Sequence, residues 1–319
     1  MRILIATDFS KHADRAIACV SSMDLPSGSH VRLIYAIEPV TTVGVFAPSD
    51  LLMLNDTERD EARAMVRAAA KRIERPQVKV DGMVGYGRAA DVVCDEARAF
   101  EPDLLVVGSR GRGAIATNVL GSVSAELVDR SPCPVLVART TSLGRIVFAE
   151  DGSPDAGAAA TVIARFAPFR AAAVDVVSVV NVPFPLVFAE PSGATAAEVA
   201  YREYQASLPI VRDRCDYLAR DRSAWLRSSG ITSTWQRREG DPAYELIAAA
   251  ETSKADCIVI GSRGQTGVRR LVLGSVARSV LFHAPCSVLV THASHAASKS
   301  SAANGQLALV TASGKEVTR

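Results

Sequence analysis

The chain repeats itself, and this internal repeat constrains its fold more than any other feature of the sequence. Residues 103–138 align with residues 256–291 at a constant offset of 153, and 16 of these 36 positions are identical. The two starts also correspond, with ILIATDFS at residues 3–10 and IVFAEDGS at residues 146–153. Self-similarity over such a span indicates a duplicated structural unit. We therefore expect two copies of one domain, copy one at residues 1–140 and copy two at residues 144–292.

Within each copy, short apolar runs rich in β-branched residues alternate with helical stretches rich in Ala, Arg and Glu. The runs are mostly continuous, which is typical of parallel strands that are covered on both faces. The order βαβαβαβαβ predicts two tandem α/β sandwiches, each with a doubly wound sheet of five parallel strands. The expected strands are residues 2–7, 31–37, 78–84, 104–108 and 135–138 in copy one, and residues 145–149, 174–180, 232–237, 257–261 and 287–291 in copy two.

The segments outside these elements also carry expectations. The joint at residues 140–144 is short, so the two domains should pack against each other as a pseudo-dimer. Residues 39–55 and 183–192 follow the second strand of each copy and are expected to form loops or lids. Residues 293–319 are rich in Ala and Ser without an apolar period, which predicts a disordered tail.

Composition excludes several classes of protein. The chain has 36 Lys and Arg against 34 Asp and Glu, so it has no excess of positive charge for a nucleic-acid partner. No apolar run is long enough for a membrane span, and Asp8 interrupts any signal-like region at the start, so we expect a cytoplasmic protein with no membrane contact. The six cysteines are scattered without zinc-type spacing, which predicts buried thiols and leaves the identity of any metal open.

A glycine-rich motif occurs twice, each time after the fourth expected strand. Its spacing, G-x2-G-x9-G-S, is the same in both copies. Ligands of open α/β sheets bind at the carboxyl ends of strands, where such loops lead into helix N-termini. Glycine lets the backbone approach phosphate oxygens, and the serine hydroxyl adds a donor, so the motif predicts a phosphate-binding loop. Tight-turn glycines with N-cap serines are the alternative.

The first strand of each copy leads into a turn with an aspartate, Asp8 or Asp151, which is followed by Ser10 or Ser153 where a helix should start. A carboxylate at this point of the sheet can accept a hydrogen bond from a ribose hydroxyl or hold a divalent cation on phosphates. Turn or cap chemistry is the alternative explanation. No His or Glu recurs as a general base at equivalent places, so we assign no catalytic residue.

Together these residues resemble the universal stress protein family, in a tandem form that covers residues 1–292. The resemblance includes the glycine motif, the first-strand Asp and the closing strands PCPVLVA and PCSVLVT. It implies strand order 3-2-1-4-5, the adenine nucleotide alpha hydrolase-like fold, and one site per copy for ATP with Mg or Mn. The implied nucleotide-binding residues are Asp8, Ala36, Gly108, Gly111, Gly121, Ser122 and Val123 in copy one, and Asp151, Val179, Gly261, Gly264, Gly274, Ser275 and Val276 in copy two.

The function that the resemblance implies is that of an ATP-binding stress-response regulator with weak or no hydrolysis and an unknown protein partner. Two alternatives stay open: a nucleotide-independent interaction module, and an enzyme that transfers phosphoryl or adenylyl groups from ATP. The family also assembles through its last strands, which implies contacts through residues 135–138 and 287–291 within the chain and in a homodimer. Val179 is larger than Ala36, and residues 268–270 are more basic than residues 114–118, so copy two is expected to bind more tightly.

Overall fold

The two halves of the chain contain the same order of strands and helices. The computed structural model describes residues 1–38, 56–111, 120–182, 194–264 and 273–293. Copy one contains β1 (Arg2–Ala6), α1 (Lys11–Ser22), β2 (Ser29–Ile37), α2 (Asp56–Lys71), β3 (Val78–Tyr86), α3 (Ala89–Phe100), β4 (Leu104–Gly108), α4 (Ser122–Arg130) and β5 (Val135–Ala138). Copy two contains β6 (Arg145–Ala149), α5 (Pro154–Arg165), the short 3-10 helix η2 (Ala167–Phe169), β7 (Ala173–Val180), α6 (Ala194–Ser228), β8 (Thr232–Glu239), α7 (Pro242–Ser253), β9 (Cys257–Gly261), α8 (Ser275–His283) and β10 (Ser287–Thr291).

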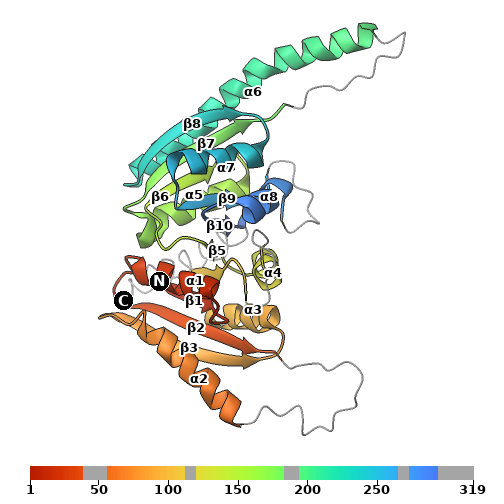
Figure 1. Ribbon diagram of the computed structural model, residues 1–319. Coiled ribbons are helices and arrows are strands. Elements are labelled where there is room, and N and C mark those ends of the chain that lie inside the picture. The colour runs from red at the N-terminus through yellow and green to blue at the C-terminus, as the bar shows by residue number, and fades with distance from the viewer. Residues whose placement is uncertain (39–55, 112–119, 183–193, 265–272, 294–319) are drawn as a thin grey trace, which may run out of the picture.

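All ten strands join in one sheet, in the order β3-β2-β1-β4-β5-β10-β9-β6-β7-β8 (Figure 1). Each half therefore has the order 3-2-1-4-5, and its neighbouring strands run parallel. The predicted fold class and strand order are confirmed. All ten predicted strands occur, and their ends differ from the predicted ends by no more than two residues.

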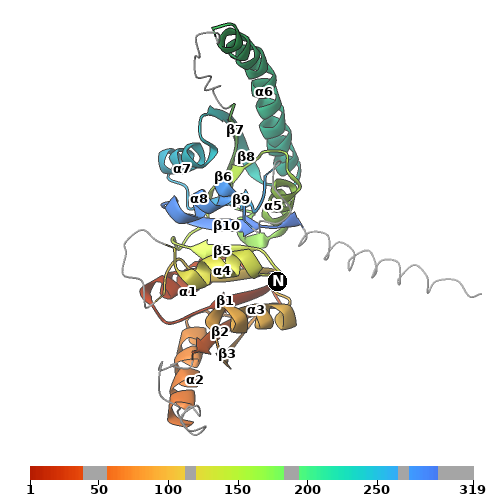
Figure 2. The same ribbon diagram turned by 90° about the vertical axis from the view of Figure 1, so that its right-hand side faces the viewer.

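Helices cover both faces of the sheet, as Figure 2 shows. Alternate residues of β1 point to opposite sides, with Ile3 and Ile5 in one apolar cluster and Leu4 and Ala6 in the other. The first cluster is completed by α1, α2, α5 and α6, and the second by α3, α4, α7 and α8. Because both faces are buried, continuous apolar runs were the correct signal for these strands.

The two halves meet where β5 and β10 pair antiparallel, with Leu136 opposite Leu289. Just beyond this ladder, Arg139 and His292 occupy equivalent places in the two copies. Arg139 Nη2 donates to the carbonyl oxygen of Leu281 at 2.5 Å, and His292 Nε2 donates to that of Val128 at 3.1 Å. Each copy thus contributes one cationic or imidazole side chain that bonds the end of a helix in the other copy.

The last strands therefore make the expected contact within the chain. Strand β5 lies between β4 and β10, and β10 lies between β5 and β9. Neither strand has a free backbone edge, so a second chain cannot pair with them. The tandem copy thus occupies the strand edge that the family resemblance implied for assembly, and a homodimer stays a prediction.

The joint between the copies is anchored by hydrogen bonds. Thr140 Oγ1 donates to the carbonyl oxygen of Asp256 at 2.8 Å, Ser142 Oγ donates to Asp256 Oδ2 at 3.1 Å, and Leu143 is buried. This agrees with the expectation that the domains pack together. Outside the described residues lie the predicted loops at 39–55 and 183–192, the segments at 114–118 and 268–270 that were compared for basic character, and nearly all of the tail at 293–319.

All six cysteines are buried free thiols, as the sequence predicted. Burial raises the pKa of Cys286 to about 11 and that of Cys19 to about 12, which disfavours the reactive thiolate. Among the helices that the structure describes, none combines the length and the apolar character that a bilayer crossing needs.

The interface between the copies predicts a pH-dependent stability. Burial lowers the pKa of His292 below its ordinary value of 6.5, so the unfolded chain binds the proton more readily than the folded chain. The stability that neutral His292 provides is present above pH 6.5 and is lost as pH falls towards its folded pKa. We expect urea unfolding between pH 7 and pH 5 to show a steeper loss of stability for the unsubstituted chain than for His292→Gln, whose amide keeps a donor but does not titrate. Parallel curves for the two proteins would contradict this role.

Candidate functional site

Each copy has a cavity at the carboxyl ends of its strands, where the sequence placed the site. The cavity of copy one has a volume of about 760 Å³ and that of copy two about 320 Å³, and both fall within the range of small-molecule sites. All seven predicted residues line the first cavity, namely Asp8, Ala36, Gly108, Gly111, Gly121, Ser122 and Val123. All seven of copy two line the second, namely Asp151, Val179, Gly261, Gly264, Gly274, Ser275 and Val276.

A turn after β1 positions the aspartate of copy one. Asp8 Oδ1 accepts a hydrogen bond from the Ser10 backbone N–H at 3.0 Å, and Ser10 caps α1 by accepting from the Ala13 N–H at 3.3 Å. The Ser10 hydroxyl also donates to the carbonyl oxygen of Arg110 at 3.3 Å, which ties the start of α1 to the glycine loop. The cap explanation for these two residues is therefore correct, and it also holds Asp8 at the cavity wall.

Copy two repeats this arrangement bond for bond. Asp151 Oδ1 accepts from the Ser153 N–H at 2.9 Å, and Ser153 accepts from the Ala156 N–H at 3.1 Å. The Ser153 hydroxyl donates to the carbonyl oxygen of Arg263 at 3.2 Å. The two copies therefore share these turn and cap bonds, which form the skeleton of the site, although the surrounding side chains differ.

The glycines of the motif have different physical roles. A Cβ at Gly108 would lie 2.6 Å from the carbonyl group of His12, and one at Gly261 would lie 2.8 Å from the carbonyl carbon of Asp155. These glycines allow strands β4 and β9 to pass close to a helix start, so they have a packing role. A Cβ at Gly111 would lie 2.8 Å from Asp8 Oδ2, so that glycine brings the loop against the carboxylate.

A helix N-terminus completes each site. The N-caps of α4 and α8 are Gly121 and Gly274, so Ser122 and Ser275 stand at the first helical position and are not cap residues. The N–H groups of a first helical turn have no partner within their helix, and the helix dipole favours negative charge there. Both cavities therefore present donors suited to an anion such as phosphate.

Apolar side chains form the rest of each wall. In copy one they include Ile34, Val93, Val107 and Leu120, and in copy two Val177, Leu246 and Ile260 stand in similar places. Such a wall beside a helix N-terminus suits a ligand with a flat apolar part and an anionic part.

Glu150 is a cavity residue that sequence reasoning missed. It occupies the place of Thr7 in copy one, and its side chain is fully buried. Glu150 Oε1 accepts from the Gly152 N–H at 2.7 Å, and Oε2 accepts from Arg222 Nε on α6 at 2.5 Å. Burial raises the pKa of Glu150, although Arg222 opposes the shift. The acidic pair at 150 and 151 was visible in the sequence, but its arginine partner lies 72 residues away.

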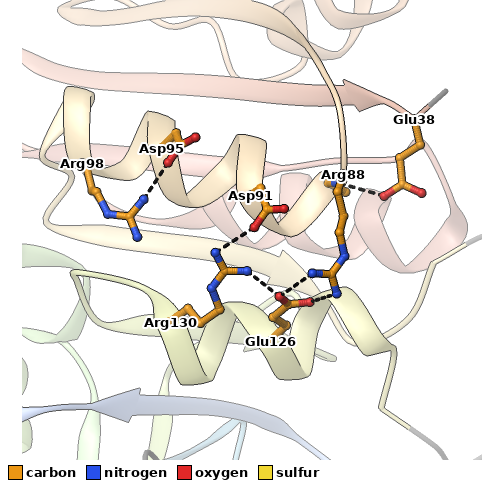
Figure 3. Close-up of polar contacts among 8 residues, drawn as sticks. Glu38, Arg88, Asp91, Asp95, Arg98, Glu126 and Arg130 are labelled. Atoms are coloured by element: carbon orange, nitrogen blue, oxygen red, sulfur yellow. Dashed lines mark hydrogen bonds and ion pairs between the residues drawn. The ribbon is translucent and has the colours of Figure 1, made fainter.

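Copy one instead carries a cluster of ion pairs between α3 and α4 (Figure 3). Arg88 forms two bonds with Glu126, at 3.0 and 2.6 Å, and Arg130 contacts both Glu126 and Asp91. Glu38, which lines the cavity, accepts a bond from the Ala89 N–H at 2.7 Å and so caps α3. Exposed pairs stabilise weakly, by about 0–1 kcal/mol each, but here they link the two helices that wall the cavity. The equivalent positions in copy two are Asp241, Tyr244, Ser279 and His283.

Within the part of the chain that the structure describes, no three His, Cys, Asp or Glu side chains come together as a metal would require. His12 in copy one and Asp155 in copy two stand at equivalent places, so the residue types there differ.

Comparison with known proteins agrees with the fold and the repeat. Residues 1–139 and 143–292 each match the Universal stress protein family. The chain belongs to this family. A universal stress protein of Mycolicibacterium smegmatis is 27% identical over 300 residues, covering 90% of this chain and 96% of that protein. One from Thermus aquaticus is 33% identical over 140 residues, which is 43% of this chain and 97% of that protein.

A solved structure supports the tandem fold of this universal stress protein. The crystal structure of a universal stress protein from Archaeoglobus fulgidus has a TM-score of 0.63 and 18% sequence identity. The match covers 92% of this chain and 98% of that one. At this identity the likeness concerns the fold.

The glycine geometry predicts opposite effects of two Gly→Ala substitutions in copy two of this universal stress protein. Gly261→Ala should destabilise the fold by roughly 1–3 kcal/mol, because its Cβ meets backbone and Cβ atoms of α5 below 3 Å. Gly157→Ala lies within α5 with nothing within 4 Å, so it should stabilise by about 0.5–1 kcal/mol. Chemical denaturation of both variants tests this pair, and equal effects would refute the packing role of Gly261.

Proposed function

We propose that this universal stress protein is an ATP-binding regulatory protein of the stress response, with one nucleotide site in each copy and weak or no hydrolysis. One observation carries the proposal: in each copy, all seven residues singled out from the sequence line a single cavity at the carboxyl ends of the strands. The sheet order brings the ends of β1, β2 and β4 together, so residues up to 115 positions apart, from Asp8 to Val123, form one wall there.

The proposed ligand fits the chemistry of the cavity walls. The phosphates would lie at the N-termini of α4 and α8, next to Ser122 and Ser275. The base would lie against the apolar wall near Ala36 or Val179. Asp8 and Asp151 have an oxygen facing the glycine loop and are suited to accept from a ribose hydroxyl. A Mg or Mn ion would enter with the phosphates, because the described residues contain no ready metal cluster.

The regulatory role follows from the lack of a shared catalytic group. Where copy one has His12, copy two has Asp155, so the two copies do not share a general base at this place. Occupancy by ATP would then act by changing which protein partner binds in the cytoplasm. An ATP-dependent transferase would in addition need a group that acts on a second substrate.

A nucleotide-independent interaction module is the second candidate. The packing of Gly108 and Gly261 against helix starts, and the turn bonds of Asp8 and Asp151, explain these residues without any ligand. They do not assign a role to Ala36, Gly111, Ser122 and Val123, which line the same cavity.

The proposal predicts that purified protein carries or binds about two adenine nucleotides per chain. Heat denaturation followed by chromatography measures what is released, and calorimetry with MgATP measures what the emptied chain binds. Asp8→Ala should remove one site and Asp151→Ala the other. Asp95→Ala is the matched control, because this exposed carboxylate pairs with Arg98 on the outer face of α3 and should leave binding unchanged (Figure 3).

Other results separate the alternatives. Release of mostly ADP would indicate hydrolysis. If no nucleotide is released, and MgATP shifts the melting temperature neither of the unsubstituted chain nor of the Gly121→Val and Gly274→Val variants, the interaction module replaces the present proposal.

A further inference from the structure

The two copies differ in chemistry at one place beside the sites, the second residue of the helix that follows the first strand. This residue is His12 in α1 and Asp155 in α5, and each stands two positions after its cap serine. Both lie beside the start of the glycine loop. The duplication has therefore kept the position and changed its chemistry.

Asp155 holds the glycine loop of copy two through several bonds. Its Oδ2 accepts from the Ser262 hydroxyl at 2.5 Å and from the Arg263 backbone N–H at 3.0 Å. The Arg263 guanidinium lies 3.6 Å from the same oxygen. The Asp155 side chain is only 7% exposed, so these bonds form away from competing water.

The other oxygen of Asp155 holds the end of the sheet. Oδ1 accepts from the Ala293 N–H at 2.8 Å, directly after His292, whose Nε2 donates to Val128 of copy one. The Thr291 hydroxyl donates to the Asp155 carbonyl oxygen at 3.2 Å. Ser262 and Arg263, at the start of the loop, are thus linked through Asp155 to α5 and to the end of β10. His292 extends this connection to α4 of the other copy.

His12 cannot hold its loop in the same way. Its Nδ1 lies 3.4 Å from the Ser109 hydroxyl, at the outer limit of a hydrogen bond. Burial and the nearby Arg110 lower the pKa of His12, which favours the neutral ring. A neutral ring nitrogen offers one bond, whereas a carboxylate oxygen accepts two or more.

We propose that Asp155 is a positioning residue of the second nucleotide site, which fixes Ser262 and Arg263 in the loop and makes copy two the tighter site. The inference rests on the proposed function, since it concerns the same cavity. A loop that is already fixed in place loses less conformational entropy when a ligand binds. Copy one, with His12 at this position, holds Ser109 less firmly and has the weaker site.

An argument from charge alone predicts the opposite effect, so the experiment can distinguish positioning from electrostatic repulsion. A carboxylate near a polyphosphate site should repel the ligand, so its removal would tighten binding if charge dominated. Here Asp155 is paired with Arg263 and accepts three hydrogen bonds, so its charge is largely compensated. We therefore expect the positioning effect to prevail.

Calorimetry with MgATP on the full chain tests this. In an Asp8→Ala background, where only the second site binds, Asp155→Ala should weaken binding at least about tenfold, the scale of losing hydrogen bonds to a charged group. Asp155→Asn keeps an oxygen for the loop and should stay within about threefold. In an Asp151→Ala background, His12→Asp should tighten the first site about threefold or more. Asp216→Ala, which breaks an ion pair with Arg237 away from the cavity, is the control and should change nothing.

The outcomes separate cleanly. If Asp155→Ala binds MgATP as tightly as the unsubstituted second site, or more tightly, the inference is overturned and the proposed function stays intact. A lack of MgATP binding by the unsubstituted chain would instead overturn the proposed function and the inference with it. If Asp155→Ala does not fold, the variants Asp155→Asn and His12→Asp decide the question. Binding by Asp155→Asn within threefold, together with tighter binding by His12→Asp, supports the inference. No gain in affinity by His12→Asp overturns it.

Discussion

The antiparallel ladder between β5 and β10 joins two half-sheets that would otherwise each end in an exposed apolar edge. Its residues, among them Leu136 and Leu289, are completely buried, and both apolar clusters run across it. An unpaired edge of this kind invites aggregation, so each copy needs a partner strand. Arg139 and His292 then bond each copy to a helix end of the other, which fixes how the two sites are placed on one frame.

The fold could be read from the sequence because a parallel sheet buried on both faces demands continuous apolar runs, and the repeat showed each run twice. The cavity residues were also predictable, since glycine spacing after a strand is a local signal. What could not be read depends on contacts between distant segments. Glu150 needs Arg222 on a helix whose register is set by packing, and Asp155 looks in sequence like any acid in a first helical turn. The packing role of Gly108 likewise appears only when α1 lies across β4.

Duplication has kept the skeleton of the site and allowed its polar surroundings to diverge. The turn bonds of Asp8 and Asp151 and the caps Ser10 and Ser153 are the same. Around them, copy one joins its helices with surface ion pairs, whereas copy two has the buried Glu150 pair and the Asp155 bonds. The two sites therefore share their backbone geometry, and they differ in the side chains around it.

The short joint at residues 140–144 changes how such a pair of domains responds to dilution. Two separate chains that pair through a strand edge dissociate when their concentration falls, and they can exchange partners. Here the joint keeps the effective concentration of one copy around the other high and constant, and β5 and β10 pair within the chain. The two cavities are therefore present in a fixed ratio at every expression level.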